Sequence, residues 1–197
     1  MTVSKTLYPV MLAVPPSTSE LPPRSRVKFL SRHARKALGI SARKSNLELG
    51  ELVKDDTGRP LPVNGVHWSL THKTGYVGAV VSLDIIGIDV EKIIPRNTRA
   101  LFRKAAEPDE WNLAGNNRSW GIFHRYWTAK EAVLKAAGIG LKDLSTCRVT
   151  QILDHNNLII HYADRFWPIE HHYFNGHIAS IVKDADRIAW TCLKDTD

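Results

Sequence analysis

The sequence predicts an α+β fold made of two similar halves that meet near residue 84. Of its 197 residues, 43% are hydrophobic, which is enough to bury a sizeable core. Short strand-like runs alternate along the chain with segments of helical periodicity. The segment GYVGAVV at 75–81 matches GHIASIV at 176–182, which begins 101 positions later. A repeat this long indicates two related halves, the alternative being a chance likeness between two buried strands.

The first half is expected to hold a strand, a helix and a strand pair. Residues 6–14 form the first strand, because the prolines that follow and the lack of a small-residue cleavage site argue against a signal peptide. Residues 24–39 have apolar side chains at helical spacing, with a stop at glycine. Residues 47–53 alternate weakly as a strand, and 65–84 reads as two strands around the polar break THKTG.

The second half begins with a strand and continues with helices. The strand lies in DIIGIDVEKI, residues 84–93, and one helix is expected over 98–115. A long helix follows over 119–140 and ends at Gly138. From Ser145 onward the sequence reads as several strands.

The composition restricts the partners and the location. The chain has 27 Lys and Arg against 20 Asp and Glu, a net charge of +7 that favours nucleic acid, a phosphate-rich ligand or an acidic protein. Its basic residues concentrate in the helix at 24–39, where a solvated surface is the simpler interpretation. Cys147 and Cys192 have no metal-ligand spacing and are too few for a disulfide framework, so we expect the protein to reside in the reducing cytoplasm. No run reaches the ~20 apolar residues of a membrane span, so a soluble protein is expected.

The strand at 84–93 has one apolar and one acidic face. Because alternate side chains of a strand share a face, Asp89 and Glu91 point the same way, opposite to Ile88 and Val90. Two neighbouring carboxylates repel each other unless a cation, a basic side chain or solvent lies between them. The pattern therefore predicts a cation, a basic side chain or solvent beside these two carboxylates.

The helix over 119–140 carries a second group of polar residues. Trp127, Glu131 and Lys135 follow one another at i, i+4 and i+8, so they lie along one helical stripe. A purely structural interpretation is also open: Thr128 and Glu131 fit a capping box, and Glu131 with Lys135 fits an i, i+4 ion pair. The helical pattern begins near Trp120, which would place Thr128 inside the helix and weakens the cap.

Taken together, the two segments predict a metal site. Asp89, Glu91 and Glu131 offer hard oxygen ligands, which Mg²⁺ prefers, with positions left for water and phosphate. The basic side chains are of the kind that a diphosphate ligand requires. The candidates for binding the diphosphate oxygens are His72 and Lys135. The candidates for binding a more distant phosphate are Arg59, Lys36 and Arg32.

Four segments carry a resemblance to a known family. GRPLP, WSLTHKTGYVGAVV, GIDVEKI and WTAKEAVLKAAGIG occur in the order seen in 4′-phosphopantetheinyl transferases, and the chain resembles them from about residue 24 to 182. It is similar to the longer, single-chain type, which is a pseudo-dimer. The resemblance implies a monomer with two halves related by a pseudo-two-fold axis. Residues 1–84 would hold the 3′-phosphate of coenzyme A, residues 85–197 would carry the metal and catalytic motifs, and the active site would lie between them.

The resemblance also implies an activity. The enzyme would bind coenzyme A and Mg²⁺ and transfer the phosphopantetheine arm to a serine of an acyl or peptidyl carrier protein, releasing 3′,5′-ADP. Such carriers serve fatty-acid, polyketide or nonribosomal peptide synthesis, and the chain would need neither membrane nor nucleic acid. The matching positions are, for the metal, Asp89, Glu91 and Glu131; for catalysis, Glu131, Lys135 and His72; and for coenzyme A, Arg32, Lys36, Arg59, Thr71, His72 and Lys135.

The chain departs from the family pattern at two positions. Thr71-His72-Lys73 stands where Ser-His-Ser is common, so Lys73 adds a charge near the diphosphate to which the sequence gives no role. Thr128 replaces the commoner Ser or Cys. Neither change removes a predicted ligand.

Two other functions compete with transfer. In a nucleic-acid-binding module, residues 24–44 would track a phosphate backbone, but three clustered carboxylates would repel it unless they held a metal. A relative that has lost catalysis would bind only carrier proteins or coenzyme A. The presence of Asp89, Glu91, Glu131 and Lys135 argues against such a loss.

Overall fold

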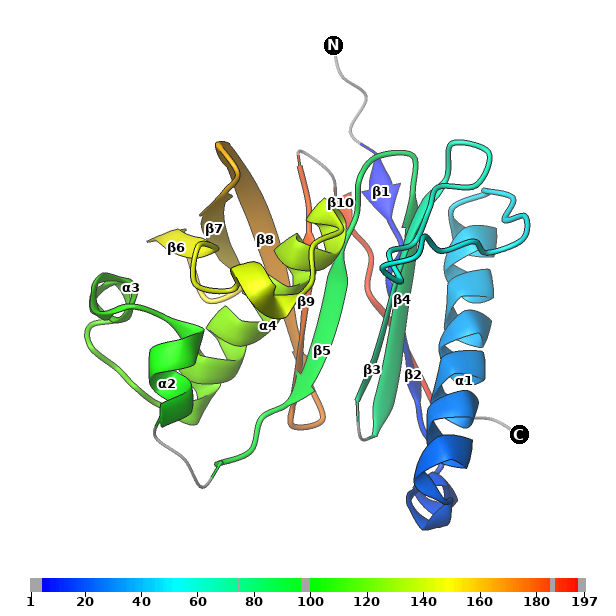
Figure 1. The fold of residues 1–197 in the computed structure, drawn as a ribbon, viewed down its shortest axis with the longest axis horizontal. Coiled ribbons are helices and arrows are strands. Elements are labelled where there is room, and N and C mark those ends of the chain that lie inside the picture. Colours follow the sequence, from blue (N-terminus) through cyan, green and yellow to red (C-terminus); the bar gives the residue numbers. More distant parts are fainter. Residues whose placement is uncertain (1–4, 74, 97–99, 185–186, 195–197) are drawn as a thin grey trace.

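A computed structural model describes residues 5–73, 75–96, 100–184 and 187–194. Helices and sheets form four layers, in which α1 covers one sheet, α4 covers another, and the two sheets pack face to face (Figure 1). The predicted α+β class is confirmed. In the described part of the chain, no helix combines the length and apolarity that crossing a membrane requires.

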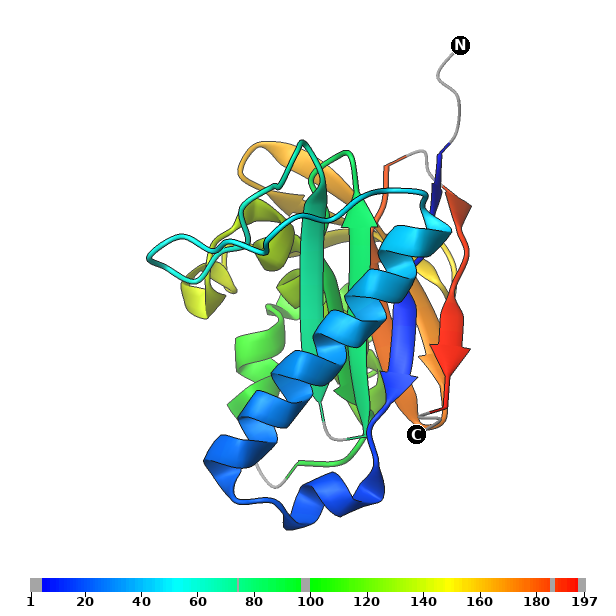
Figure 2. The same cartoon turned by 90° about the vertical axis from the view of Figure 1, so that its right-hand side faces the viewer.

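The first half of the chain builds the layers around α1. Helix α1 crosses the outer face of its sheet, as the side view shows (Figure 2). Its elements are β1 Thr6–Leu7, β2 Val10–Ala13, the 3-10 helix η1 Pro16–Glu20, α1 Pro23–Lys44, β3 His67–Lys73 and β4 Tyr76–Ser82. The predicted strand pair is confirmed. The single strand predicted over residues 6–14 is instead two short strands, β1 and β2, which belong to different sheets.

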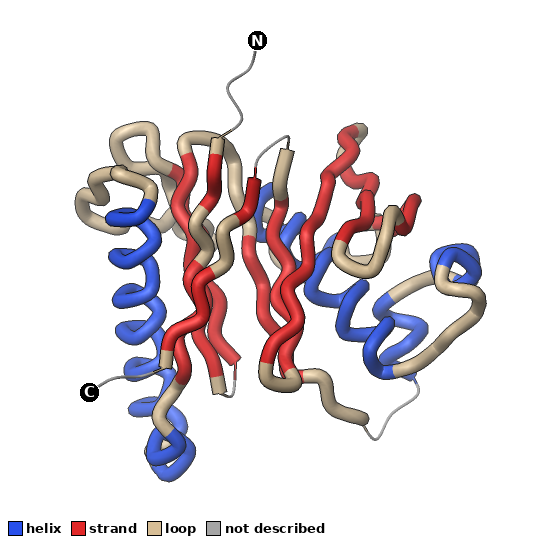
Figure 3. The backbone as a smooth tube through the Cα atoms, turned by 180° about the vertical axis from the view of Figure 1, so that it is seen from behind, coloured by secondary structure: helices blue, strands red, loops and turns tan. Residues whose placement is uncertain are grey.

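The second half builds the layers around α4. Seen from behind, its strands stand beside those of the first half, with the helices on the outside (Figure 3). Its elements are β5 Ile88–Lys92, α2 Ala100–Ala105, α3 Pro108–Leu113, α4 Trp120–Ala137, η2 Leu141–Asp143, β6 Arg148–Ile152, β7 Asn157–Tyr162, β8 Arg165–Phe174, β9 His177–Val182, β10 Arg187–Ile188 and β11 Thr191–Leu193.

The two large sheets share an order of strands. One runs β11-β2-β4-β3 and the other β5-β9-β8-β7-β6, so β2-β4-β3 corresponds to β5-β9-β8. The central strands β4 and β9 are the segments that the internal sequence match aligned. A pseudo-two-fold relation between the halves stays a prediction.

The C-terminal strands return to the first half. Strand β10 pairs in parallel with β1, and β11 pairs in parallel with β2. Residues 187–194 therefore extend sheets of the N-terminal half, although the predicted boundaries placed them in the half at 85–197. The division near residue 84 itself stays a prediction.

Three further predicted elements differ from the structure. Helix α1 continues past Gly39 to Lys44, because Ser41 bonds to the carbonyl oxygen of Tyr8 (2.8 Å) and Ala42 is buried. Residues 47–53 form no strand; their leucines instead pack against the α1 core. The helix expected over 98–115 is two helices, because Pro108 starts α3 behind a capping box; residues 98 and 99 lie outside the described chain.

Helix α4 is fixed at both ends and along its buried face. Ser119 caps its start, and Gly138 ends it in the left-handed conformation (φ 73°), as predicted. Lys130 on its buried side pairs with Glu110 of α3 at 2.7 Å, and both side chains are 1% exposed. Breaking one partner of such a pair leaves an uncompensated buried charge. The pair therefore fixes the orientation of α4 relative to α3.

Gly87, directly before β5, packs on the backbone of α4. A Cβ atom added at Gly87 would lie 1.9 Å from the carbonyl oxygen of Ala132 and 2.7 Å from the amide nitrogen of Ala136. Only glycine permits this approach, because both obstructing atoms belong to the helix backbone and cannot move aside like a flexible side chain. The contact sets how closely the acidic strand approaches the helix that carries Glu131.

We expect Gly87→Ala to destabilise the protein by at least about 3 kcal/mol, since the methyl group would push β5 off α4. Gly121→Ala is the matched control, because its added Cβ would meet only the Ser119 hydroxyl oxygen at 3.8 Å. Gly121 lies in α4, so this change should be neutral or stabilising by up to about 1 kcal/mol. Thermal and urea unfolding measure both; equal stability of the two variants would contradict the packing argument.

Candidate active site

Side chains of β3 cover the free edge of β5. The hydroxyl oxygen of Ser69 accepts from the amide of Ile88 (3.2 Å), and that of Thr71 accepts from the amide of Val90 (3.3 Å). Strand β5 pairs with β9 on its other edge, so these two hydroxyls satisfy amides that would otherwise lack a partner. The first half of the chain thus fixes the strand that carries the predicted metal ligands.

The acidic face of β5 points toward α4. Asp89 stands opposite Ser180 in the register of β5 and β9, and directly opposed residues of a strand pair share a face. Ser180 forms a hydrogen bond with Thr128 of α4, with 2.6 Å between the hydroxyl oxygens. Thr128 lies inside the helix and donates to the carbonyl oxygen of His124 (2.8 Å), so the capping-box interpretation was wrong.

The three predicted metal ligands come together. One carboxylate oxygen from each of Asp89, Glu91 and Glu131 lies within 4.8 Å of the others. Asp89 Oδ2 and Glu91 Oε2 are buried and have no hydrogen-bond partner among the described residues. Buried oxygens of this kind are normally satisfied, so their lack of a partner fits a cation held between them. The donor set of three carboxylates suits Mg²⁺.

Lys135 joins this cluster to the rest of the site. Its ammonium lies 2.6 Å from Asp89 Oδ1, which also accepts from Thr71 (2.8 Å). The predicted ion pair between Lys135 and Glu131 is absent among the described residues, because the lysine reaches across to β5 instead. The structural interpretation of Lys135 as an i, i+4 partner was therefore wrong.

Glu91 has its own cations. The Lys73 ammonium lies 2.5 Å from Glu91 Oε1, and the Arg96 guanidinium lies 3.6 Å from Oε2. Lys73, whose role the sequence left open, thus contacts a predicted metal ligand.

Burial and mutual repulsion shift the titration of the cluster. Burial, and then the charges of Asp89 and Glu91, raise the pKa of Glu131 to about 7, against opposing effects of Lys135 and a hydrogen bond with Trp127. Burial also raises the pKa of Glu91, although Lys73 opposes the shift. A cation would relieve the repulsion that raises both values.

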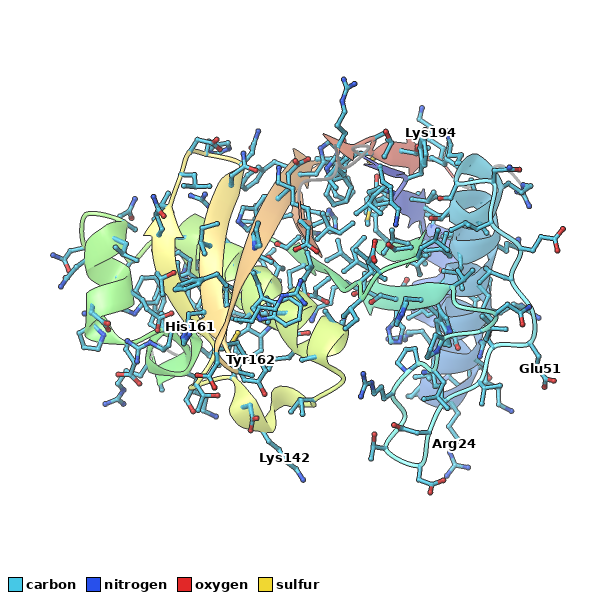
Figure 4. The ribbon with its side chains drawn as sticks, turned by 90° about the horizontal axis from the view of Figure 1, so that it is seen from above. Arg24, Glu51, Lys142, His161, Tyr162 and Lys194 are labelled. Carbon is cyan, nitrogen blue, oxygen red and sulfur yellow. The ribbon has the colours of Figure 1, made fainter. Side chains whose placement is uncertain are left out.

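A cleft of about 580 Å³ is lined in part by Lys135, the residue that pairs with Asp89. It lies between the loop before β3, the edge strand β3 and the C-terminal end of α4. Its basic lining residues are Lys54, Arg59, Lys135 and Lys142. Seen from above, the α1 and α4 halves lie side by side, and the side chain of Lys142 projects outward from the α4 half (Figure 4). Lys135 both lines the cleft and bonds to Asp89, so it connects the cleft to the carboxylates.

Arg59 crosses over the end of α4. A Cβ atom at Gly138 would lie 2.0 Å from Arg59 Nε, so glycine at this position leaves room for the guanidinium as well as ending the helix. The arginine, predicted from the turn GRPLP, therefore reaches across the cleft to the second half. Its predicted contact with a phosphate stays a prediction.

The other predicted ligand-binding residues lie in different settings. Thr71 is buried, and its hydroxyl bonds to Asp89 and to β5. His72 is exposed in part, and its pKa is lowered by partial burial and then by the charge of Lys135. Arg32 and Lys36 are exposed on α1 and do not line the cleft. Their predicted contacts with coenzyme A stay predictions.

Four residues of the site were missed from the sequence. Lys54 and Trp68 line the cleft, with the Lys54 ammonium 6.0 Å from the centre of the Trp68 ring. Lys142 lines it from the other side, and Arg96 approaches Glu91. For the three basic residues, a surplus of lysine and arginine was the only signal, and it does not distinguish them from solvated residues. Trp68 reads from the sequence as an ordinary apolar residue of a strand.

The comparisons with known proteins agree on one family. Residues 85–182 match the model of the 4′-phosphopantetheinyl transferase superfamily. The 4′-phosphopantetheinyl transferase HetI of Nostoc is 29% identical over 156 residues, covering 70% of this chain and 66% of the relative. A phosphopantetheinyl transferase of Thraustochytrium is 30% identical over 121 residues, covering 53% and 42%. A Haemophilus influenzae relative is 29% identical over 114 residues, covering 54% and 48%.

The chain thus spans between 42% and 66% of the length of these curated relatives. The family match covers β5, α4 and β9, the elements that bring the three carboxylates together. The chain belongs to the 4′-phosphopantetheinyl transferase superfamily.

Proposed function

We propose that the chain transfers the 4′-phosphopantetheine arm of coenzyme A to a serine of an acyl or peptidyl carrier protein, in a reaction that needs Mg²⁺. One observation carries the proposal: three carboxylates lie within 4.8 Å of one another, and Lys135 both pairs with one of them, Asp89, and lines a basic cleft. A cation site next to a basic cleft suits a diphosphate ligand, which must be bound and neutralised together.

Asp89, Glu91 and Glu131 would hold the cation. A bound Mg²⁺ would neutralise charge on the diphosphate and so help the leaving group depart. The buried oxygens without hydrogen-bond partners on Asp89 and Glu91 support this assignment.

The basic residues would bind and orient coenzyme A. Lys135 already holds Asp89 and lines the cleft, which suits it to a diphosphate oxygen, with His72 as its neighbour on the edge strand. Arg59 would receive the 3′-phosphate, because a guanidinium binds phosphate through two parallel hydrogen bonds. Arg32 and Lys36 of α1 are the further candidates for that phosphate.

Glu131 would accept the proton of the carrier serine, directly or through water. The serine oxygen then bonds to the phosphorus that bears the pantetheine group, and the bond from that phosphorus to the adenosine-side phosphate oxygen breaks, releasing 3′,5′-ADP. A carboxylate in this role typically accelerates a reaction ~10²–10⁴-fold, most efficiently with a pKa near the working pH.

The partner would be an acidic carrier protein in the cytoplasm. The net charge of +7 would speed encounter with such a partner and would make the rate fall with added salt. We expect the enzyme to act as a monomer, because both halves of one chain supply the cleft: Arg59 and β3 come from the first half, and Lys135 of α4 from the second.

Wild-type protein mixed with apo carrier protein, coenzyme A and Mg²⁺ should add one phosphopantetheine arm to the carrier, and EDTA should prevent it. Intact-protein mass spectrometry measures the gain. Carriers from fatty-acid, polyketide and peptide synthesis should all be tried. If none gains the arm, although the protein remains folded and binds coenzyme A, the proposed transfer is wrong for these carriers.

Asp89→Asn and Glu131→Gln should each lower the transfer rate at least about 10³-fold, because each removes a charged ligand that cancels charge on the reacting phosphate. Both substitutions preserve shape, so the melting temperature should change little. Asp84→Asn is the control: Asp84 is an exposed carboxylate five positions before Asp89, and it should leave the rate unchanged. Loss of folding in both site variants would instead indicate that the carboxylates are structural.

Arg59→Ala should raise the KM for coenzyme A about tenfold or more, while leaving that for dephospho-coenzyme A, which lacks the 3′-phosphate, nearly unchanged. Lys36→Ala is the comparison, because Lys36 does not line the cleft and should have the smaller effect. Steady-state kinetics with both substrates tests this. An equal loss with the two substrates would rule out a 3′-phosphate contact for Arg59.

A further inference from the structure

Lys73 is a charged residue at the site, and it has no role in the proposed reaction. It ends strand β3, its side chain is 36% exposed, and its ammonium lies 2.5 Å from Glu91 Oε1. We propose that Lys73 is a positioning residue: it restricts Glu91 to one metal-binding oxygen and so selects small six-coordinate cations over Ca²⁺. This inference rests on the proposed function, because it assumes that the three carboxylates bind a divalent cation.

The two buried carboxylates of β5 have the same arrangement. In Asp89, Oδ1 accepts from Lys135 and Thr71, while Oδ2 has no hydrogen-bond partner among the described residues. In Glu91, Oε1 accepts from Lys73, while Oε2 likewise has none, the Arg96 guanidinium being 3.6 Å away. A lysine thus occupies one oxygen of each carboxylate and leaves one for a cation.

The number of available oxygens affects which cation binds. Mg²⁺ requires nearly octahedral coordination and takes few protein carboxylates, whereas Ca²⁺ accepts six to eight oxygens, often two from one carboxylate. With Lys73 in place, Glu91 offers a single oxygen. Removing the ammonium would free Oε1, and Glu91 could then bind a larger cation through both oxygens.

The charge of Lys73 has a second effect. Two lysines and Arg96 surround the three carboxylates, so the site attracts a bare cation less than three uncompensated charges would. The partly exposed position of Lys73 weakens this effect through solvent screening but does not remove it. Lys73 therefore lowers the affinity for free cations, and the anionic diphosphate restores the balance when both bind.

Binding of Mn²⁺, followed by electron paramagnetic resonance and competed with Mg²⁺ or Ca²⁺, tests the inference without any turnover. In Lys73→Ser, Mn²⁺ should bind roughly tenfold tighter or more, because a positive charge next to the site is lost. The affinity for Ca²⁺ should increase more than the affinity for Mg²⁺, since only Ca²⁺ can coordinate the freed oxygen as well.

Two variants separate coordination from charge. Lys92→Ser removes the same charge from the next residue after Glu91, but Lys92 points to the other face of β5, is exposed and makes no ion pair among the described residues. It should change the affinities little and the order of the cations not at all. Lys73→Arg retains a cationic donor and should preserve the wild-type preference. Thermal unfolding confirms that each variant is folded.

The possible results are distinguishable. If wild-type protein binds none of the three cations, with or without coenzyme A, the proposed metal site and this inference both fail. If wild-type protein binds them and Lys73→Ser matches Lys92→Ser in affinity and in the ratio of Ca²⁺ to Mg²⁺, only the role of Lys73 fails. Weaker binding by Lys73→Ser would also overturn it, because Lys73 would then support Glu91 as a ligand.

Discussion

The backbone contact between β5 and α4 at Gly87 is the constraint on which the site depends. A strand and a helix normally keep apart because of the side chains between them, and here the absence of a Cβ atom removes that spacing. Two residues further on, Asp89 meets the part of α4 that carries Glu131 and Lys135. On the opposite side of α4, the buried pair of Lys130 and Glu110 fixes the orientation of the helix relative to α3. The position of the carboxylates thus follows from packing that involves none of them.

The electrostatic repulsion among the three carboxylates is offset by side chains from both halves of the chain. Lys73 and Thr71 come from β3, and Lys135 from α4, so the acidic strand is held between cations and donors on two sides. Even so, one oxygen on each of Asp89 and Glu91 has no hydrogen-bond partner among the described residues, and Glu131 has a raised pKa. A site that is not fully satisfied by its own side chains is one that gains free energy when a cation binds.

The elements that depend on local pattern could be predicted from the sequence, and contacts between distant segments could not. The alternation of β5 predicted that Asp89 and Glu91 share a face, and the glycine at 138 predicted the end of α4. Residues 47–53 alternate weakly, as in a strand, yet their leucines pack on α1 as part of a loop, because tertiary contacts decided their conformation. The pairing of Lys73 with Glu91 joins residues 18 positions apart on facing strands, and nothing in the local sequence indicates it.

We propose that the two halves of the chain form one site, in which a cation lies between Asp89, Glu91 and Glu131, next to the basic cleft. The most direct measurement is a crystal structure with coenzyme A and Mn²⁺, in which anomalous scattering locates the metal. On this proposal, we expect a single strong peak within coordinating distance of all three carboxylates, with the diphosphate beside Lys135. A peak elsewhere, or coenzyme A bound away from the cleft, would contradict it.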